Sequence, residues 1–224
     1  MFWLLLPTKI WIMKLAEIRK QYLLNELKEE EVGNDPLSFF NKWLSEAISA
    51  GVPEPTAMVL STISSDNKPS SRVVLLKSCE EGRFIFFTNY HSAKGKQLES
   101  NPNASVLFFW KELERQIRIE GSTVKLSEET SDEYFNSRPA ESRLGAIISP
   151  QSQVIESREA IEKLYESKIY LLDNQKDLVR PQHWGGYALI PESIEFWQGR
   201  ASRLHDRIRF RKADNLWIRE RLAP

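Results

Sequence analysis

Two helical patterns open the chain. Over residues 14–31 apolar side chains recur every three to four positions, with Leu15, Ile18, Tyr22 and Leu23 on one stripe, which predicts an amphipathic helix. Residues 34–51 predict a second helix, because Asp35 can cap it, Pro36 suits its first turn and Gly51 can end it. The side chains of this helix expected to face the core are Leu37, Phe40, Trp43, Leu44, Ala47 and Ile48.

From residue 56 the pattern changes to that of β-strands. Five runs rich in Val, Ile, Phe and Thr follow one another at 56–64, 70–79, 82–90, 104–113 and 115–127. Short connections between neighbouring strands favour antiparallel pairing, and five strands in series suggest a barrel or a sandwich. Helical stretches are predicted at 127–139 and 157–174, then strands at 184–190 and 193–199 and a hairpin over 207–222. The pattern predicts one α+β domain built around an antiparallel barrel.

Residues 1–12 stand outside this pattern. Two short apolar runs flank Pro7 and Lys9, far short of the roughly 20 apolar residues that a membrane-spanning helix needs. The basic segment and the small-residue cleavage site of a signal peptide are also missing. We therefore expect residues 1–12 to be a disordered extension and residues 13–224 to form a single domain.

The charge balance narrows the choice of partners. Lys+Arg and Asp+Glu number 31 each, so no overall field favours nucleic acid or a membrane surface. Locally, residues 196–224 hold eight basic and three acidic side chains, so an anionic ligand is expected near this end. Cys79 is the single cysteine, which excludes an intramolecular disulfide, argues against a thiolate metal site and fits the cytoplasm.

Known nucleotide and hydrolase motifs are missing from the sequence. It contains no G-x-G-x-x-G, no G-x-x-x-x-G-K-[ST], no H-E-x-x-H and no G-x-S-x-G. Binding of a phosphate would therefore depend on cationic side chains. We expect no metal site.

Three places offer such cations, each with a simpler interpretation beside it. Arg72 and Lys77 bracket four aliphatic residues at an odd offset, so in a regular strand they would face opposite sides; they could also mark strand ends at the surface. The segment 88-TNYHSAKGKQ-97 is a polar loop suited to a phosphate, or a solvated loop. Tyr134 and Arg138 lie four residues apart, so they share a helix face and can grip one phosphate, or they form a surface pair.

Several longer segments carry a specific resemblance. RVVLLK, FFTNYHSAK, FFWKELERQIRIEG, YFNSRPAESRLGAIISPQS, IEFWQGRASRLHDRIRF and the final RLAP occur in this order between Arg19 and Pro224. Together they resemble the pyridoxine/pyridoxamine 5′-phosphate oxidase family. The resemblance implies a split β-barrel that forms a homodimer with FMN at the subunit interface. It also implies oxidation of pyridoxine or pyridoxamine 5′-phosphate to pyridoxal 5′-phosphate, with O₂ reduced to H₂O₂.

The same resemblance implies a set of site residues. Arg203 and His205 would be catalytic and lie over the pyridine ring, where Arg203 positions the substrate and His205 orients its ring oxygen or accepts a proton. The implied FMN contacts are Arg72, Val73, Val74, Leu75, Leu76, Lys77, Phe87, Thr88, Lys94, Gln116, Gln151, Ser152, Trp197 and Arg207. The implied substrate contacts are Arg19, Lys20, Gln21, Tyr22, Lys77, Tyr134, Arg138, Ser142, Arg203 and His205.

The chain departs from the family pattern in two places. Ala93 precedes Lys94 where the family usually has arginine, and Lys20 and Gln21 stand where many relatives carry arginine and glutamate. Two other interpretations stay open: a split-barrel flavin enzyme with a different substrate, and a non-catalytic carrier of flavin or pyridoxal phosphate. The joint presence of the implied substrate contacts favours the oxidase.

Overall fold

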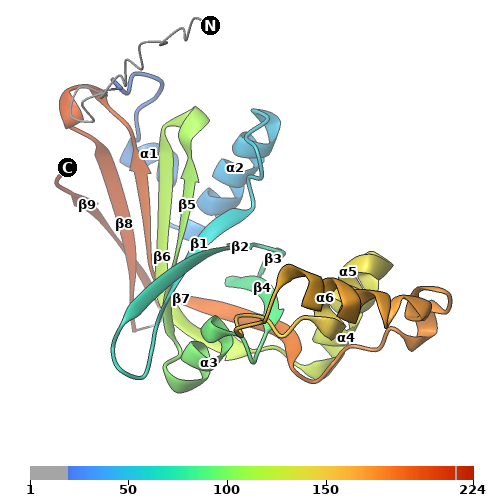
Figure 1. The fold of residues 1–224 in the computed structure, drawn as a ribbon. Helices are drawn as coiled ribbons and strands as arrows, with labels where there is room; N and C mark the ends of the chain where they lie inside the picture. Colours follow the sequence, from blue (N-terminus) through green and yellow to red (C-terminus); the bar gives the residue numbers. More distant parts are fainter. Residues whose placement is uncertain (1–19, 215) are drawn as a thin grey trace, which may run out of the picture.

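The computed structural model describes residues 20–214 and 216–224. Within them nine strands form one antiparallel sheet with helices at its periphery (Figure 1), which confirms the predicted α+β class. Residues 1–12, Leu15, Ile18 and Arg19 lie outside the described residues, so the predicted extension and the single domain at 13–224 stay predictions. None of the helices in the described part is long and apolar enough to cross a membrane.

The elements follow the chain in a mixed order. The strands are β1 (Ala57–Ile63), β2 (Pro69–Leu75), β3 (Ser78–Glu80), β4 (Arg83–Asn89), β5 (Asn103–Trp110), β6 (Arg115–Lys125), β7 (Trp184–Gln198), β8 (Asp206–Ala213) and β9 (Leu216–Leu222). The α-helices are α1 (Glu29–Val32), α2 (Pro36–Ser49), α3 (Ala93–Ser100), α4 (Glu128–Ser137), α5 (Ala140–Ile148) and α6 (Arg158–Glu166). Short 3₁₀ turns are η2 (Lys111–Leu113), η3 (Ile169–Leu172), η4 (Gln175–Asp177) and η5 (Ala201–Arg203).

Strand β7 divides the sheet. The hydrogen-bonded order is β2-β1-β5-β6-β7-β4-β3, and β8 and β9 continue from β7 as a second branch. The first half of β7, up to Leu189, pairs with β4, and its second half, from Ser193, pairs with β8. The sequence predicted two strands here, but they are one strand that passes through Pro191. Gly121 of β6 is needed at this point, since a Cβ there would lie 2.0 Å from the carbonyl oxygen of Ile190.

Helix α2 covers the inner face of the sheet and follows its predicted boundaries. The Asp35 side chain accepts the N–H groups of Leu37 and Ser38. Phe40 is fully buried against Phe84 and Phe108, with ring centroids 4.9 and 5.3 Å apart. The expected burial of Ile48 was wrong: its side chain is 58% exposed, because the buried stripe runs through Phe39, Phe40, Trp43 and Ala47.

The predicted helix over 14–31 was wrong for most of its described part. Only Glu29–Val32 is helical, as α1. The backbone N–H groups of Leu23 and Leu24 donate to the Glu114 carboxylate, and that of Leu27 donates to Asp206. Acceptors 90 or more residues away in sequence therefore replace the local carbonyls that a helix would use.

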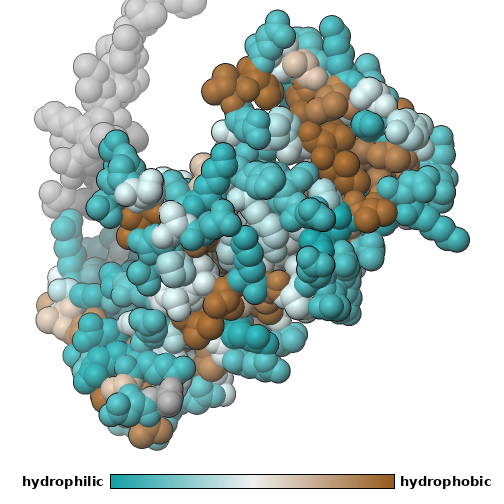
Figure 2. All heavy atoms as spheres, turned by 90° about the horizontal axis from the view of Figure 1, so that it is seen from below, coloured by the Kyte–Doolittle hydropathy of each residue, from teal (hydrophilic) through white to brown (hydrophobic). Residues whose placement is uncertain are grey.

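The helices after residue 90 were only partly predicted. The polar loop expected at 88–97 becomes helix α3 from Ala93, with the Ser92 side chain as its N-cap. Helix α5 was not predicted at all, and the stretch 157–174 is divided into α6 and the 3₁₀ turn η3. Helices α4 to α6 gather at one side of the sheet (Figure 1). Figure 2 shows apolar side chains on this helical side, where Ile155, Leu164 and Ile169 are among the exposed ones.

Candidate active site

A first cavity of about 550 Å³ lies beside the edge strand β2, and we call it the β2 cavity. It is walled by β2, β4, the start of α3 and the segment from α4 to α5, with Trp184 of β7. The predicted site residues that line it are Arg72, Val73, Val74, Leu75, Lys77, Phe87, Thr88, Lys94, Tyr134, Arg138, Ser142 and Gln151. The sequence did not predict Asn89, Pro139 and Trp184, which also line it.

The β2 cavity is positively charged. Among the described residues, its lining includes Arg72, Lys77, Lys94 and Arg138 but no aspartate or glutamate. Burial, and then the nearby Arg72, lower the pKa of Lys94 to about 8. Burial also lowers the pKa of Arg138, and its Nη1 atom is buried without a hydrogen-bond partner. The cavity therefore fits a ligand with more than one negative oxygen.

Neutral oxygen atoms hold two of these cations in place. Nζ of Lys94 donates to Gln151 Oε1 at 2.9 Å and to Thr88 Oγ1 at 3.1 Å. Arg72 donates through Nη1 to Thr62 Oγ1 at 2.6 Å and to the carbonyl of Leu60 at 3.1 Å. Because none of these acceptors is charged, the positive charge stays available to a ligand.

The expectation that Arg72 and Lys77 face opposite sides assumed one regular strand through both residues. Strand β2 ends at Leu75, so the alternation of a regular strand no longer applies at Lys77, and both cations line the same cavity. The aliphatic residues between them are not all buried either. Val73 is 64% exposed and Leu75 37%, whereas Leu76 is buried.

Aromatic rings close the helical side of the β2 cavity. Phe87 and Tyr134 stack with their centroids 3.8 Å apart, and the guanidinium of Arg138 lies 4.7 Å from the centre of the Trp184 ring. Tyr134 and Arg138 both line the cavity, but Arg138 is the C-cap of α4 and has an extended backbone, so the predicted shared helix face does not apply to this pair.

A second cavity of about 720 Å³ lies where β7 leads into β8, and we call it the β7–β8 cavity. The predicted site residues that line it are Lys20, Gln21, Tyr22, Trp197, Arg203 and His205, and Arg200 and Ser202 join them. Arg200 and Ser202 were missed, although both lie in the arginine-rich segment singled out by the sequence. Ser202 and Arg203 have φ of 56° and 62°, a left-handed backbone that is costly for residues other than glycine.

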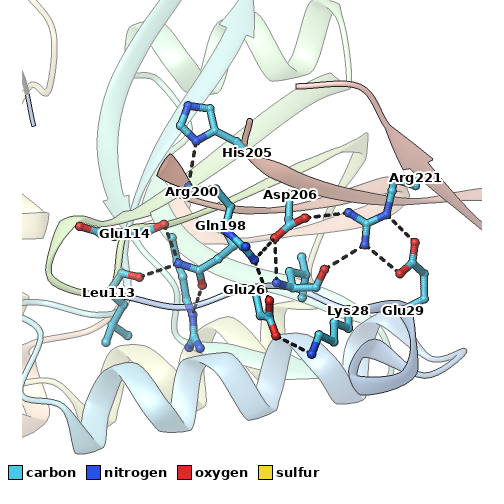
Figure 3. Close-up of polar contacts among 12 residues, drawn as sticks. Glu26, Lys28, Glu29, Leu113, Glu114, Gln198, Arg200, His205, Asp206 and Arg221 are labelled. Carbon is cyan, nitrogen blue, oxygen red and sulfur yellow. Dashed lines mark hydrogen bonds and ion pairs between the residues drawn. The ribbon is translucent and has the colours of Figure 1, made fainter. Parts of the chain in front are cut away.

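The tautomer of His205 follows from its hydrogen bond. Its Nδ1 atom accepts the backbone N–H of Arg200 at 3.1 Å, so Nδ1 carries no proton (Figure 3). Burial, and then the charge of Arg203, lower the pKa of His205, which favours the neutral ring with its proton on Nε2. Of the two roles expected for His205, this arrangement favours hydrogen-bond donation over proton abstraction.

Four further predicted residues line neither cavity: the buried Leu76, and Gln116, Arg207 and Ser152. Gln116 of β6 and Arg207 of β8 flank Trp197 on the outer face of the sheet. Nε of Arg207 donates to the buried carboxylate of Glu195 at 2.7 Å, a bond that raises the pKa of Arg207. Ser152 follows Gln151, is exposed, and has a φ of 69°.

The two cavities are far apart within one chain. Trp184 lines the first and Trp197 the second, and they stand at opposite ends of β7. Thirteen residues at roughly 3.3 Å each give a separation on the order of 40 Å. A single cofactor of ordinary size cannot contact both cavities of the same chain.

Comparison with known proteins identifies the family. Residues 44–167 match the model of pyridoxamine 5′-phosphate oxidase, and residues 184–224 match the C-terminal dimerisation region of pyridoxine 5′-phosphate oxidase. The chain belongs to the pyridoxamine 5′-phosphate oxidase family. A pyridoxine/pyridoxamine 5′-phosphate oxidase of Leptospira interrogans is 51% identical over 94% of this chain and 99% of its own length. One from Microcystis aeruginosa is 53% identical over 95% and 99%.

Solved structures agree with the family's split-barrel fold. PhzG from Burkholderia lata, solved with tetrahydrophenazine-1-carboxylic acid, is 33% identical, covers 90% of this chain and 99% of its own, and has a TM-score of 0.84. An FMN-binding protein from Nostoc punctiforme related to the oxidase family shares the fold at a TM-score of 0.71 and 16% identity. The match of residues 184–224 to the family's dimerisation region supports a homodimer.

Proposed function

We propose that the protein oxidises pyridoxine 5′-phosphate or pyridoxamine 5′-phosphate to pyridoxal 5′-phosphate, with FMN as cofactor and O₂ reduced to H₂O₂. Relatives that carry this enzyme's name share 51–53% of their residues with the chain over most of its length. The observation that carries the proposal is the β2 cavity, whose four cations face no carboxylate in its lining. The cytoplasm is the location we propose, on the basis of the single cysteine.

Two phosphates share the cations of the β2 cavity in this proposal. Arg72 and Lys94, which lie close enough for Arg72 to lower the pKa of Lys94, would hold the phosphate of FMN. Lys77 and Arg138 would hold the phosphate of the substrate, together with the hydroxyl groups of Tyr134 and Ser142. The buried and unpartnered Nη1 of Arg138 gains a hydrogen bond when an anion enters, which favours binding.

The complete site would contain residues of two chains. Trp197, Arg203, His205 and Arg207 belong to the other end of β7, about 40 Å along the strand from the β2 cavity of the same chain. In a homodimer, the β7–β8 cavity of one subunit can face the β2 cavity of its partner. FMN would then lie at the subunit interface, in contact with both.

The chain's own residues would bind and orient the reactants. FMN, when bound, accepts a hydride from the substrate carbon that bears the amine or alcohol, and O₂ takes up the electrons. Arg203 would hold the substrate ring, and His205 would donate a hydrogen bond from Nε2 to the oxygen attached to that ring. Trp197 would wall off solvent, and Arg207, fixed by Glu195, would stabilise negative charge that builds up on the cofactor.

A spectrum and a peroxide assay test the proposal. We expect a yellow protein that releases FMN and not FAD on acid denaturation, and that produces H₂O₂ with pyridoxamine 5′-phosphate. A yellow protein without peroxide would support a carrier. Equal rates with pyridoxamine and its 5′-phosphate would support a flavin enzyme for another substrate, because the phosphate-binding cations would then contribute nothing. A colourless protein that FMN cannot reconstitute would contradict the proposal.

A further inference from the structure

Residues 20–28, which we call the strap, form one wall of the β7–β8 cavity without regular secondary structure. Lys20, Gln21 and Tyr22 line the cavity, yet no helix or strand ladder fixes the strap in place. Its backbone donors go instead to carboxylates of distant elements. The strap therefore depends on individual side chains for its position.

Glu114 supplies most of this anchoring. It is 2% exposed, and among the described residues its carboxylate has three donors, all from the strap. Oε2 accepts the N–H groups of Leu23 at 2.9 Å and Leu24 at 3.1 Å, and Oε1 lies 3.0 Å from Nζ of Lys20. Burial alone would raise the pKa of Glu114, but the Leu24 N–H, Lys20 and the Leu23 N–H together lower it. The carboxylate therefore stays charged and bonded at neutral pH.

The backbone of Glu114 anchors the opposite wall of the same cavity. Its carbonyl oxygen accepts the N–H of Gly199 at 2.8 Å and Nε2 of Gln198 at 3.2 Å (Figure 3). Gln198 is fully buried and also accepts Nε of Arg115 at 3.1 Å. Gly199 begins the loop that carries Arg203 and His205. One residue thus connects the strap with this loop.

Tyr22 is the side chain of the strap that contacts the opposite wall of the cavity. Its ring meets Trp197 edge-on with centroids 5.6 Å apart and meets His205 at 5.7 Å. Its third neighbour is the backbone at Gly199, where an added Cβ would lie 2.7 Å from Cγ of Tyr22. The ring therefore packs so closely on the backbone at Gly199 that any side chain at position 199 would displace it.

We propose that Glu114 is a positioning residue for the proposed oxidation, which holds Tyr22 against Trp197, His205 and Gly199 so that the β7–β8 cavity keeps the shape that receives the substrate ring. The inference rests on the proposed function. Glu114 itself does not line the cavity, so it acts through the strap and the loop.

Two unrelated substitutions should produce the same kinetic change. Glu114→Gln weakens the contacts of its side chain with Lys20 and with the N–H groups of Leu23 and Leu24. Gly199→Ala places a methyl group where the Tyr22 ring packs and changes no charge. Each should raise the KM for pyridoxamine 5′-phosphate and weaken binding of pyridoxal 5′-phosphate about tenfold, with a smaller change in FMN affinity. The double variant should be no worse than the stronger single variant, since both displace the same ring. Glu112→Gln, an exposed glutamate two residues away, is the matched control and should behave as the wild type.

The outcomes separate the inference from the proposed function. If the wild type makes no peroxide, the function fails, while binding of pyridoxal 5′-phosphate still compares the variants. If Glu114→Gln and Gly199→Ala both bind this ligand like the Glu112→Gln control, the positioning role is wrong. A loss of FMN affinity as large as the loss of ligand affinity would indicate general unfolding and would also overturn it. Should Gly199→Ala fail to fold, Tyr22→Ala takes its place, with the same expected tenfold weakening.

Discussion

The two cavities use positive charge in opposite ways. In the β2 cavity, Lys94 and Arg72 are bonded to neutral oxygen atoms, and no carboxylate lies in the lining. In the β7–β8 cavity two of the three cations in the described lining are paired: Lys20 lies 3.0 Å from the carboxylate of Glu114, and Arg200 lies 3.1 Å from that of Asp206.

This difference indicates that the two cavities have different roles. A desolvated cation without a counter-ion is costly in the free protein and attracts an incoming anion strongly, so the β2 cavity is built for binding. A cation paired with a carboxylate attracts an anion less, but the pair holds backbone and rings in place. The β7–β8 cavity, with the rings of Tyr22, Trp197 and His205 in mutual contact, is built for orientation.

The largest effect should come from a cation that orients. Arg203→Ala should lower kcat/KM by about 100-fold or more, because misplacing the reacting carbon costs rate as well as affinity. Arg138→Ala should mainly raise KM, since it removes binding shared by the ground state and the transition state. Steady-state kinetics of both variants with pyridoxamine 5′-phosphate measure this contrast. Small and equal effects would contradict the division between the cavities.

Mixing these two variants tests whether the cavities of different subunits cooperate. In a mixed dimer, one site would carry both substitutions and the other neither. Random exchange makes about half of the dimers mixed, so at a substrate concentration well below the raised KM of Arg138→Ala the activity should recover to about a quarter of the wild-type value. Peroxide release before and after subunit exchange gives the answer, with each variant alone as control. If each chain holds a complete site, mixing restores nothing.

Local patterns predicted the elements that local forces determine. Runs of β-forming residues located β1, β2, β4, β5 and β6, and Asp35 and Pro36 located the start of α2, because residue preference and capping act over a few residues. The split-barrel fold and the site residues came from the resemblance to a family. Nothing in the residues themselves would have brought Lys77 and Arg138 into one cavity.

What escaped prediction depends on contacts between distant parts of the chain. The strap has a helical pattern, but Glu114 and Asp206 capture its N–H groups from 91 and 179 residues away. The sequence of helix α3 is polar, so the segment that begins with its N-cap Ser92 was predicted to be a loop. Trp184 lines the β2 cavity and Arg200 lines the β7–β8 cavity because β7 extends from one cavity to the other. No periodicity in the sequence indicates that β7 has this length.

A smaller effect should appear when the charge of Lys94 is titrated. Its pKa in the free protein is about 8, and a bound phosphate must raise it, so the protonated form binds FMN better. The affinity for FMN should be constant below pH 8 and fall by up to about tenfold per pH unit above it, until the raised pKa of the complex is reached. Fluorescence titrations of the FMN-free protein between pH 7 and 10 measure the slope. In Lys94→Arg the affinity for FMN should no longer fall above pH 8. An unchanged slope in that variant would mean that a group other than Lys94 titrates.

The smallest effect should come from the residue next to Lys94. Ala93 is exposed at the first position of α3, where the family usually carries arginine. His91 does not replace that cation, since its ring stacks on His183 with centroids 5.5 Å apart and does not line the β2 cavity. Ala93→Arg should therefore strengthen FMN binding, by about 2- to 5-fold, because an exposed ion pair contributes roughly 1 kcal/mol or less.

Salt distinguishes an added ion pair from a change in shape. The gain from Ala93→Arg should shrink between low and high ionic strength, because screening weakens exposed charges. Ala93→Gln, which adds length without charge, should bind FMN like the wild type. Turnover at saturating FMN should stay constant in all three proteins, since the substitution strengthens binding without changing the reacting groups. Quenching of flavin fluorescence at two salt concentrations measures the affinities. If arginine and glutamine strengthen binding equally, or if the gain ignores salt, Arg72 and Lys94 already neutralise the phosphate and the missing family cation has no electrostatic consequence here.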